Sequence, residues 1–186
     1  MNREWNNDCF HPIETEKIDC FKKELETVSG VCLVCKTKEE AKEKIKAILQ
    51  ENQISELFCS EERLISQLNG LPITTDKKRF LSMETGITSC EFLVARTGSV
   101  VLSSAQGGRQ MNIYPPIHIV LARKSQIVDY VSDAISEIQK KYGDDLPSCI
   151  SFVSGPSRTA DIEKTLVLGA HGPKSLYVVI IEKWKK

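Results

Sequence analysis

The sequence has no excess of charge of either sign. Its 25 Lys and Arg residues balance 25 Asp and Glu residues, so the formal net charge is zero at pH 7. Domains that grip the phosphate backbone usually carry a basic excess, which argues against nucleic-acid binding. There is also no apolar run near the roughly 20 residues that a membrane-spanning helix needs, and the N-terminus lacks the basic-then-apolar pattern of a signal peptide. These absences predict a cytoplasmic protein with no membrane span.

The seven cysteines do not form the clustered Cys-x-x-Cys series that usually holds an iron–sulfur cluster. Most of them lie in apolar runs, as small buried hydrophobic residues do in a reducing compartment. Cys32 and Cys35 do form a C-x-x-C pair, but their run reads as a strand, in which residues three apart point to opposite faces. A metal or redox site there would need further ligands or a helix start. We therefore expect no cofactor and no metal on this chain alone.

The length of 186 residues suits one domain with a normal core. We expect residues 1–30 to form an N-terminal arm or peripheral helix and residues 31–186 to form the domain. The domain opens with a strand over 31–36 and a helix that starts at Thr37. A short strand over 57–59 and a second helix follow, the latter capped by Ser60. This alternation predicts the α/β class, with an open, mostly parallel sheet and helices on both faces.

The second half of the chain adds other elements. Two apolar runs within 91–104 flank Gly98, which predicts a β-hairpin. Ser125 is expected to cap the longest helix, and a short helix is expected around 164–168. The run 176–181 is apolar at every position, which is typical of a strand covered on both faces.

A polar stretch, SGPSRTADIE, occupies residues 154–163 between two expected core elements. In open α/β sheets, ligands bind where strands end and helices begin, and backbone N–H groups there favour an anion. Arg158 is the residue type that clamps a carboxylate or phosphate with two hydrogen bonds. The alternative is that the serines, the threonine and Asp161 only cap and balance a helix. The expected ligand is a small anion, and the predicted binding residues are Ser154, Gly155, Ser157, Arg158, Thr159, Asp161, Gly98 and Arg109.

This stretch and the following Leu168-Gly169-Ala170-His171-Gly172-Pro173 resemble the C-terminal signature of the LUD (lactate utilisation) domain family. Residues 86–88, 95–104 and 115–120 fall in the same order and spacing as in that family. The resemblance covers about residues 30–186. It implies a fold like that of the glucosamine-phosphate isomerase, ribose-phosphate isomerase and CoA-transferase group. It also implies a role beside iron–sulfur partner proteins that oxidise L-lactate to pyruvate.

Several alternatives stay open. The chain could be a free-standing enzyme of the same fold, acting on a phosphosugar, an acyl-CoA or a folate-like substrate. It could also be a regulatory module with a vestigial pocket, since Arg96 stands where many family members carry an acidic residue. A homodimer that completes the sheet edges is a third open question.

Individual side chains leave similar choices. His171, flanked by glycines, is a candidate catalytic residue or a plain loop histidine, and His118 in an apolar strand is either a satisfied core histidine or a site residue. Arg96 and Arg109 add positive charge over a pocket or are simply solvated. Glu84 and Glu91 are conceivable catalytic carboxylates that nothing else in the sequence supports.

Overall fold

The computed structural model describes residues 12–106, 114–162, 165–168 and 172–184, with only the backbone described for 159–162 and 165–168. Among these residues lie four α-helices, twelve strands and three 3₁₀ turns. The helices are α1 (Lys17–Thr27), α2 (Lys38–Glu51), α3 (Glu62–Gln67) and α4 (Val131–Tyr142), and the turns are Phe80–Ser82, Ala95–Thr97 and Lys124–Gln126. The strands are β1 (Val31–Cys35), β2 (Leu57–Phe58), β3 (Ile73–Thr74), β4 (Thr85–Thr88), β5 (Phe92–Val94), β6 (Ser99–Ser103), β7 (Ile117–Arg123), β8 (Ile127–Val128), β9 (Ile150–Val153), β10 (Arg158–Ile162), β11 (Thr165–Leu168) and β12 (Ser175–Ile181).

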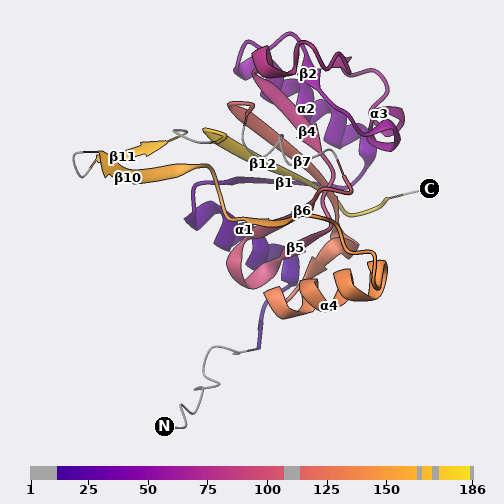
Figure 1. Ribbon diagram of the computed structural model, residues 1–186, viewed down its shortest axis with the longest axis vertical. Helices are drawn as coiled ribbons and strands as arrows, with labels where there is room; N and C mark the ends of the chain where they lie inside the picture. The colour runs from indigo at the N-terminus through magenta and orange to yellow at the C-terminus, as the bar shows by residue number, and fades with distance from the viewer. Residues whose placement is uncertain (1–11, 107–113, 163–164, 169–171, 185–186) are drawn as a thin grey trace.

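The central element is a six-stranded sheet in the order β1-β12-β7-β4-β2-β3 (Figure 1). All five of its strand pairs are parallel. The all-apolar run 176–181 forms β12, which pairs with β1 on one side and β7 on the other. The predicted α/β class with an open, mostly parallel sheet is confirmed.

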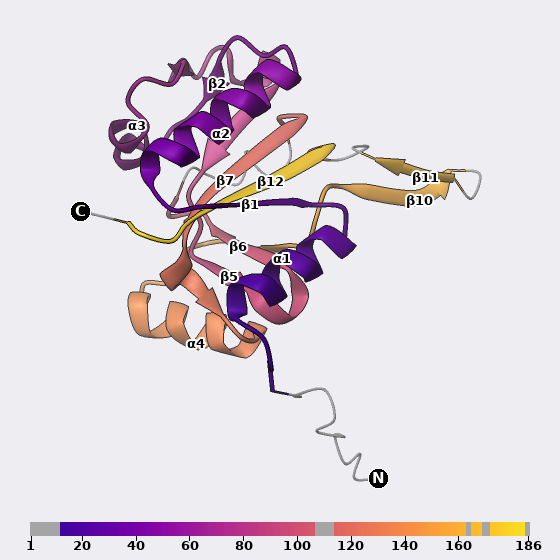
Figure 2. The ribbon, with the colours of Figure 1, turned by 180° about the vertical axis from the view of Figure 1, so that it is seen from behind.

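Both faces of this sheet are buried, as its apolar strands require. On one face, α2 and α3 contribute Ile45, Ile48, Leu64 and other side chains to a core with β7 and β12. Thr37 begins α2, because its hydroxyl accepts a hydrogen bond from the Glu40 backbone N–H. Figure 2 shows α2 on this side of the sheet and α1 on the other.

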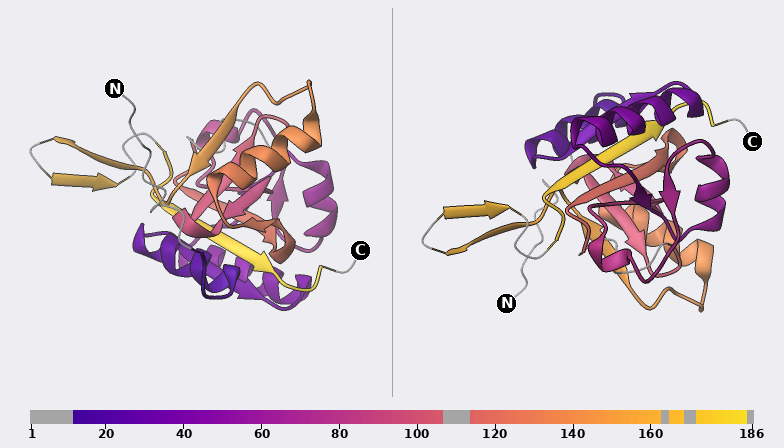
Figure 3. Two further views of the ribbon diagram at one scale, coloured as in Figure 1. Left: turned by 90° about the horizontal axis from the view of Figure 1, so that it is seen from below. Right: turned by 90° about the horizontal axis from the view of Figure 1, so that it is seen from above.

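The second face is covered by α1 and by a smaller four-stranded sheet in the order β8-β5-β6-β9. Strands β5 and β6 form the predicted hairpin, and Gly98 adopts a φ of 58° at its turn. Helix α4 packs Ala134 and Ile138 against the outer side of this sheet. The order of layers is therefore helices, parallel sheet, second sheet with α1, and α4 (Figure 1), a stack that Figure 3 views from below and from above.

Helix α1 is part of the packed domain, although it lies in the region expected to form an arm or peripheral helix. Its Phe21 and Leu25 side chains are fully buried. They join a core that includes residues of β6, β7 and β12. The position of α1 matters for the site described below, because loops from the second sheet meet its C-terminal end.

One expected helix begins later than predicted, and another is replaced by strands. The segment after Ser125 first forms β8, in which Ile127 pairs with Leu93, and the helix begins only at Val131. The Asp133 carboxylate accepts the Tyr130 backbone N–H at 3.0 Å, so Asp133 rather than Ser125 supports the helix start. This helix is also shorter than α2.

Residues 158–162 and 165–168 pair as the antiparallel strands β10 and β11, instead of the short helix expected around 164–168. The segment is rich in β-branched residues, which favour strands over helices. The pair extends away from the layered body (Figure 1). The strand-to-helix junction predicted at 154–161 is therefore absent, and with it the helix-dipole part of the anion argument. Across the described ranges, no helix is long and apolar enough to cross a membrane.

Candidate functional site

A cavity among the described residues lies where parallel strands end. It has a volume of about 750 Å³ and adjoins a second cavity of about 360 Å³, and we call the two together the carboxyl-end groove. Ser60 and Glu61 follow β2, and Ser89 follows β4. The carboxyl ends of parallel strands are the usual ligand edge of an open α/β sheet. Both cavities are lined by Glu61, Arg63, Ser89, Gln106 and Lys141.

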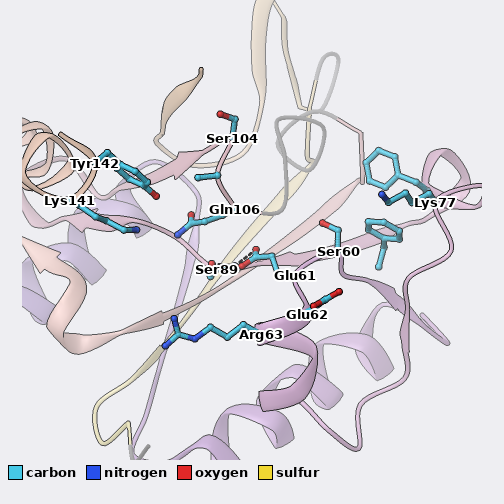
Figure 4. A pocket seen from close by; sticks show the side chains of 13 residues that line it. Ser60, Glu61, Glu62, Arg63, Lys77, Ser89, Ser104, Gln106, Lys141 and Tyr142 are labelled. Atoms are coloured by element: carbon cyan, nitrogen blue, oxygen red, sulfur yellow. Dashed lines mark hydrogen bonds between the residues drawn. The ribbon is translucent and has the colours of Figure 1, made fainter. Parts of the chain in front are cut away.

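Glu61 joins two of the strand ends that form the groove. One of its carboxylate oxygens accepts the Ser89 backbone N–H at 2.8 Å, and the other accepts the Ser89 hydroxyl at 2.5 Å. These two bonds hold the carboxylate in one orientation at the wall shared by both cavities (Figure 4). A carboxylate fixed in this way keeps its remaining lone pairs available to a ligand.

Glu91 is a buried carboxylate at the rear of the groove, with a side chain only 1% exposed. It accepts hydrogen bonds from Lys141 at 2.6 Å, Ser103 at 2.6 Å and Tyr142 at 2.7 Å. Burial alone would raise the pKa of Glu91, but the bonds from Lys141, Ser103 and Tyr142 outweigh it and the pKa is lowered. Glu91 therefore stays ionised and fixes the Lys141 ammonium beside the cavity.

Two further cations line the larger cavity, Arg63 and Lys77, and the carboxylates of Glu61 and Glu62 line the same cavity. Arg63 and Lys77 form no ion pair with any described residue. Gln106 adds a buried side-chain oxygen that has no hydrogen-bond partner within the described part of the chain. In Figure 4, Lys141 and Gln106 reach into the cavity from one side, and Lys77 and Ser60 from the other. The groove thus offers cations, carboxylates and neutral hydrogen-bonding groups to a ligand that enters it.

An aromatic pair closes one part of the larger cavity. The rings of Phe58 and Phe80 lie 4.9 Å apart at an angle of 57°. They supply the apolar contact area that ligand pockets usually combine with a few polar groups.

The polar loop that the sequence singles out lies at the opposite end of the parallel sheet. The Ser157 backbone N–H donates to the carbonyl of Pro173, and Lys174 next to it donates to the carbonyl of Pro116. Pro116 precedes β7, and Pro173 and Lys174 precede β12. This loop is therefore at the amino ends of the strands, across the sheet from the groove.

Two of the predicted glycines there are required by the approach of α1. Gly98 has a φ of 58°, and a Cβ atom on it would lie 2.3 Å from the backbone nitrogen of Leu25. Gly155 has a φ of 78°, and its Cβ would lie 2.2 Å from the carbonyl oxygen of Val28. Both positions need glycine because the backbone of α1 or its C-cap fills the space that a side chain would take.

The neighbouring predicted residues also have structural partners. The Arg158 guanidinium donates to the backbone carbonyl of Val28, at the C-terminal end of α1. The Ser154 hydroxyl lies 2.6 Å from that of Ser99, which lies 2.6 Å from that of Thr97. The structure thus brings Gly98, Ser154, Gly155 and Arg158 together in one cluster. This cluster packs against the C-terminal end of α1. Ligand binding by these residues stays a prediction.

The other predicted residues divide into two groups. Thr159 and Asp161 lie in β10, where only the backbone is described. Arg109 and the catalytic candidate His171 lie outside the described residues. Arg96 is exposed on the turn beside α1.

His118 lies in β7 and is only 1% exposed. Its Nε2 atom is 2.9 Å from the Thr88 hydroxyl, whereas its Nδ1 atom has no hydrogen-bond partner in the parts of the chain that are described. Burial lowers the pKa of His118 to about 4, so the ring is neutral at pH 7. It lines a third cavity of about 240 Å³ together with Gly155 and Ser157.

Cys32 and Cys35 point to opposite faces of the sheet, as predicted, because Cys32 packs in the core with α1 and Cys35 in the core with α2. Burial raises the pKa of Cys32 to about 12 and that of Cys35 to about 11. Both are therefore protonated at neutral pH, and metal ligation needs the thiolate. These two thiols behave as small core residues.

The fold and the groove together define a class: a layered α/β domain with a ligand-sized groove at the carboxyl ends of its parallel strands. Within that class, the chain belongs to the LUD domain family, whose sequence model matches residues 18–181. That match takes in α1, the parallel sheet and the second sheet.

Several relatives carry names that refer to lactate. The chain is 42% identical over 102 residues to lactate utilization protein C of Halalkalibacterium halodurans, and 39% identical over 102 residues to that of Bacillus subtilis. The aligned parts cover 53% of this chain and 44% and 42% of those proteins. The chain thus spans about half the length of the curated relatives it matches. It is also 39% identical over 99 residues to the uncharacterized protein YkgG of Escherichia coli, covering 51% of this chain and 43% of that protein.

A crystal structure of a DUF162 family protein from Deinococcus radiodurans shares the fold. The TM-score is 0.69 at 16% sequence identity, and the match covers 91% of this chain and 99% of that one. At this identity the likeness concerns the arrangement of the elements alone.

Proposed function

We propose that this chain serves lactate utilisation by binding a small organic anion in the carboxyl-end groove, as the non-cluster member of a system whose iron–sulfur clusters lie on partner proteins. The observation that carries the proposal is the set of cations in the groove. Arg63 and Lys77 have no ion-pair partner among described residues, and Lys141 is fixed by Glu91. Lactate and pyruvate are small carboxylates, which is the ligand chemistry that such cations suit.

The proposal draws on the family and on the chemistry of the groove in different ways. The relatives' names support the lactate role. The groove supports an anionic ligand, because two cations without an ion-pair partner among the described residues, Arg63 and Lys77, lie at the usual ligand edge of the fold. The partners, their clusters and a cytoplasmic location follow from the family resemblance and the absent clustered cysteines. A homodimer and the anion-binding role of the loop around Arg158 stay as predicted alternatives.

Growth on L-lactate tests the role of the groove in cells. Cells that lack their own copy would receive the wild-type chain, an Arg63→Ala/Lys77→Ala variant or a Lys78→Ala control, whose residue does not line the groove. We expect the wild type and the control to restore growth and the double variant to restore it poorly. Full rescue by the double variant would argue against the groove.

Co-purification tests the proposed partners. Tagged protein from lactate-grown cells should bring down iron-containing proteins, with bound iron in the eluate above that of a tag-only control. If the chain comes out alone and free of iron, the subunit role is wrong.

A second candidate is a free-standing enzyme of the same fold, acting on a phosphosugar, acyl-CoA or folate-like substrate. The observation that favours it is the pair of oriented carboxylates, Glu61 and Glu91, which acid–base or nucleophilic chemistry could use. Turnover of one of these substrates by the purified chain, lost in Glu61→Gln, would favour this alternative.

A further inference from the structure

The third cavity lies at the amino ends of the parallel strands and is separate from the carboxyl-end groove. Its residues come from β7, β9, the loop before β10 and the start of β12, and none of them lines the groove. We call it the amino-end cavity. It is lined by His118, Phe152, Val153, Gly155, Ser157, Pro173 and Leu176.

The lining of this cavity is mostly apolar. Phe152, Val153 and Leu176 give it an apolar wall, and none of its described lining residues carries an acidic or permanently charged side chain. Two lining residues have polar side chains, Ser157 and His118. His118 is 1% exposed and has an Nδ1 atom without a partner among the described residues. A buried polar atom without a hydrogen bond is destabilising, and most such atoms in native proteins have a partner.

The environment of His118 explains why its second nitrogen stays available. The Thr88 hydroxyl holds Nε2 at 2.9 Å, which fixes the ring in the layer between the two sheets. Because a hydroxyl both donates and accepts, either ring tautomer satisfies that bond. Nδ1 can therefore act as a donor or as an acceptor, on a residue that lines the cavity.

We propose that the amino-end cavity binds a small uncharged molecule with a hydroxyl, carbonyl or amide group, held by a hydrogen bond to Nδ1 of His118. The volume of about 240 Å³ has room for roughly eight heavy atoms, given about 30 Å³ for each water-sized group. An anion is disfavoured there, because burying a charge without a partner costs more than burying a hydrogen-bonded neutral group. Two described cations adjoin lining residues along the chain, and neither lines the cavity: the Arg158 guanidinium donates to the carbonyl of Val28, and Lys174 is exposed.

Lactamide and L-lactate form a matched pair of probes, because they differ mainly in replacing a carboxylate by an uncharged amide. The full chain, labelled with ¹⁵N at its three histidines, would be titrated with each probe in the millimolar range. We expect a saturable shift of the His118 Nδ1 resonance with lactamide and none with L-lactate. A His118→Leu variant assigns the resonance.

A variant that fills the cavity while keeping His118 and Thr88 provides the main control. Phe152 lines the cavity and is 38% exposed, so Phe152→Trp is expected to fold and to abolish the lactamide shift. Leu146→Trp, at an exposed position that does not line the cavity, should leave the shift intact.

Three outcomes would overturn the proposal: no saturable shift with lactamide, an equal shift in Phe152→Trp, or an equal shift with L-lactate. The first would mean that water alone occupies the cavity, and the last that it takes anions. The proposal does not depend on the function of the groove, because lactate bound near Arg63 and Lys77 would leave the His118 signal unchanged.

Discussion

At the carboxyl ends of the parallel strands, polar side chains surround an open groove, whereas at the amino ends the polar loop holds a helix. Arg63 and Lys77 in the groove have no ion-pair partner among described residues, while Arg158 at the other end donates to the carbonyl of Val28. The two regions contain similar residue types. The difference shows that a polar loop in a sequence marks a ligand site only if its side chains are not already used to hold the chain together.

The largest expected effect on stability concerns the packing of α1 against Gly98. Gly98→Ala places a Cβ atom against the backbone of Leu25 at a φ of 58°. The left-handed backbone costs about 1–3 kcal/mol and the overpacking a similar amount, so we expect a loss of about 4 kcal/mol in the free energy of unfolding. Urea denaturation measures it.

Gly70→Ala is the matched control. Gly70 also has a positive φ, of 93°, but a Cβ atom there would meet nothing within 4 Å. Gly70→Ala should lower the free energy of unfolding by no more than about 2 kcal/mol, because only the backbone conformation is strained. Equal losses at the two positions would show that α1 does not press on Gly98.

The next largest effect on stability is expected from the protonation of His118. The pKa of His118 is lowered to about 4, whereas an unfolded histidine has about 6.5. As the pH falls below 6.5 the unfolded chain gains a proton that folded His118 does not take up, so stability declines down to about pH 4. Over that whole pH range the free energy of unfolding is expected to fall by about 3 kcal/mol.

Chemical denaturation between pH 7 and pH 5 isolates this effect from most carboxylates, which titrate lower. His118→Leu should be less dependent on pH over that range than the wild type. An unchanged pH slope in this variant would mean that His118 protonates without cost in the folded protein.

In the groove, Lys141→Ala leaves the buried Glu91 carboxylate without its cation. Removing one partner of a fully buried pair costs about 3–5 kcal/mol. Because Lys141 is half exposed, we expect Lys141→Ala to lower the free energy of unfolding by about 2 kcal/mol at pH 7. The pKa of Glu91 is lowered in the wild type, so its contribution is present above pH 4.5 and is lost as the pH falls.

The adjacent Lys140 pairs with Glu137 on the surface, and as the matched control Lys140→Ala should leave the free energy of unfolding nearly unchanged. Thermal or urea unfolding of the two variants at pH 7 gives the comparison directly. If Lys141→Ala is as mild as Lys140→Ala, the Glu91 network does not organise the groove.

The smallest effect is expected for Arg158→Ala. The lost hydrogen bond to Val28 lies at an exposed side chain, so we expect about 1 kcal/mol or less in unfolding free energy. The affinity for L-lactate should not change. A tenfold loss of affinity would instead support the anion site that the sequence alone predicts at this loop.

The sequence predicts those parts of the fold whose signals are local. The capping pair Thr37 and Glu40, the glycine turn at Gly98 and the all-apolar strand before Glu182 each depend on a few neighbouring residues. The helix expected around 164–168 is wrong because the apolar residues there suit a helix or a strand, and pairing between β10 and β11 decides the outcome.

The groove could not be predicted in the same way, because it is assembled from distant segments. Ser89 and Glu61 are 28 residues apart, and Glu91 and Lys141 are 50 apart. They meet only because β4 lies next to β2 in the sheet and α4 packs on the second sheet. A carboxylate at the start of an apolar strand was the available signal for Glu91, and nothing nearby in the sequence identified its partners.

Calorimetric titration of L-lactate tests the central claim, that a small anion binds at the carboxyl-end groove rather than at the amino-end loop. The wild type, Arg63→Ala/Lys77→Ala and Arg158→Ala would be compared at one ionic strength. Charge-assisted hydrogen bonds contribute about 1.5–3 kcal/mol each, so we expect the double variant to bind at least about tenfold more weakly and Arg158→Ala to bind like the wild type. Weakened binding in Arg158→Ala with full affinity in the double variant would contradict the account.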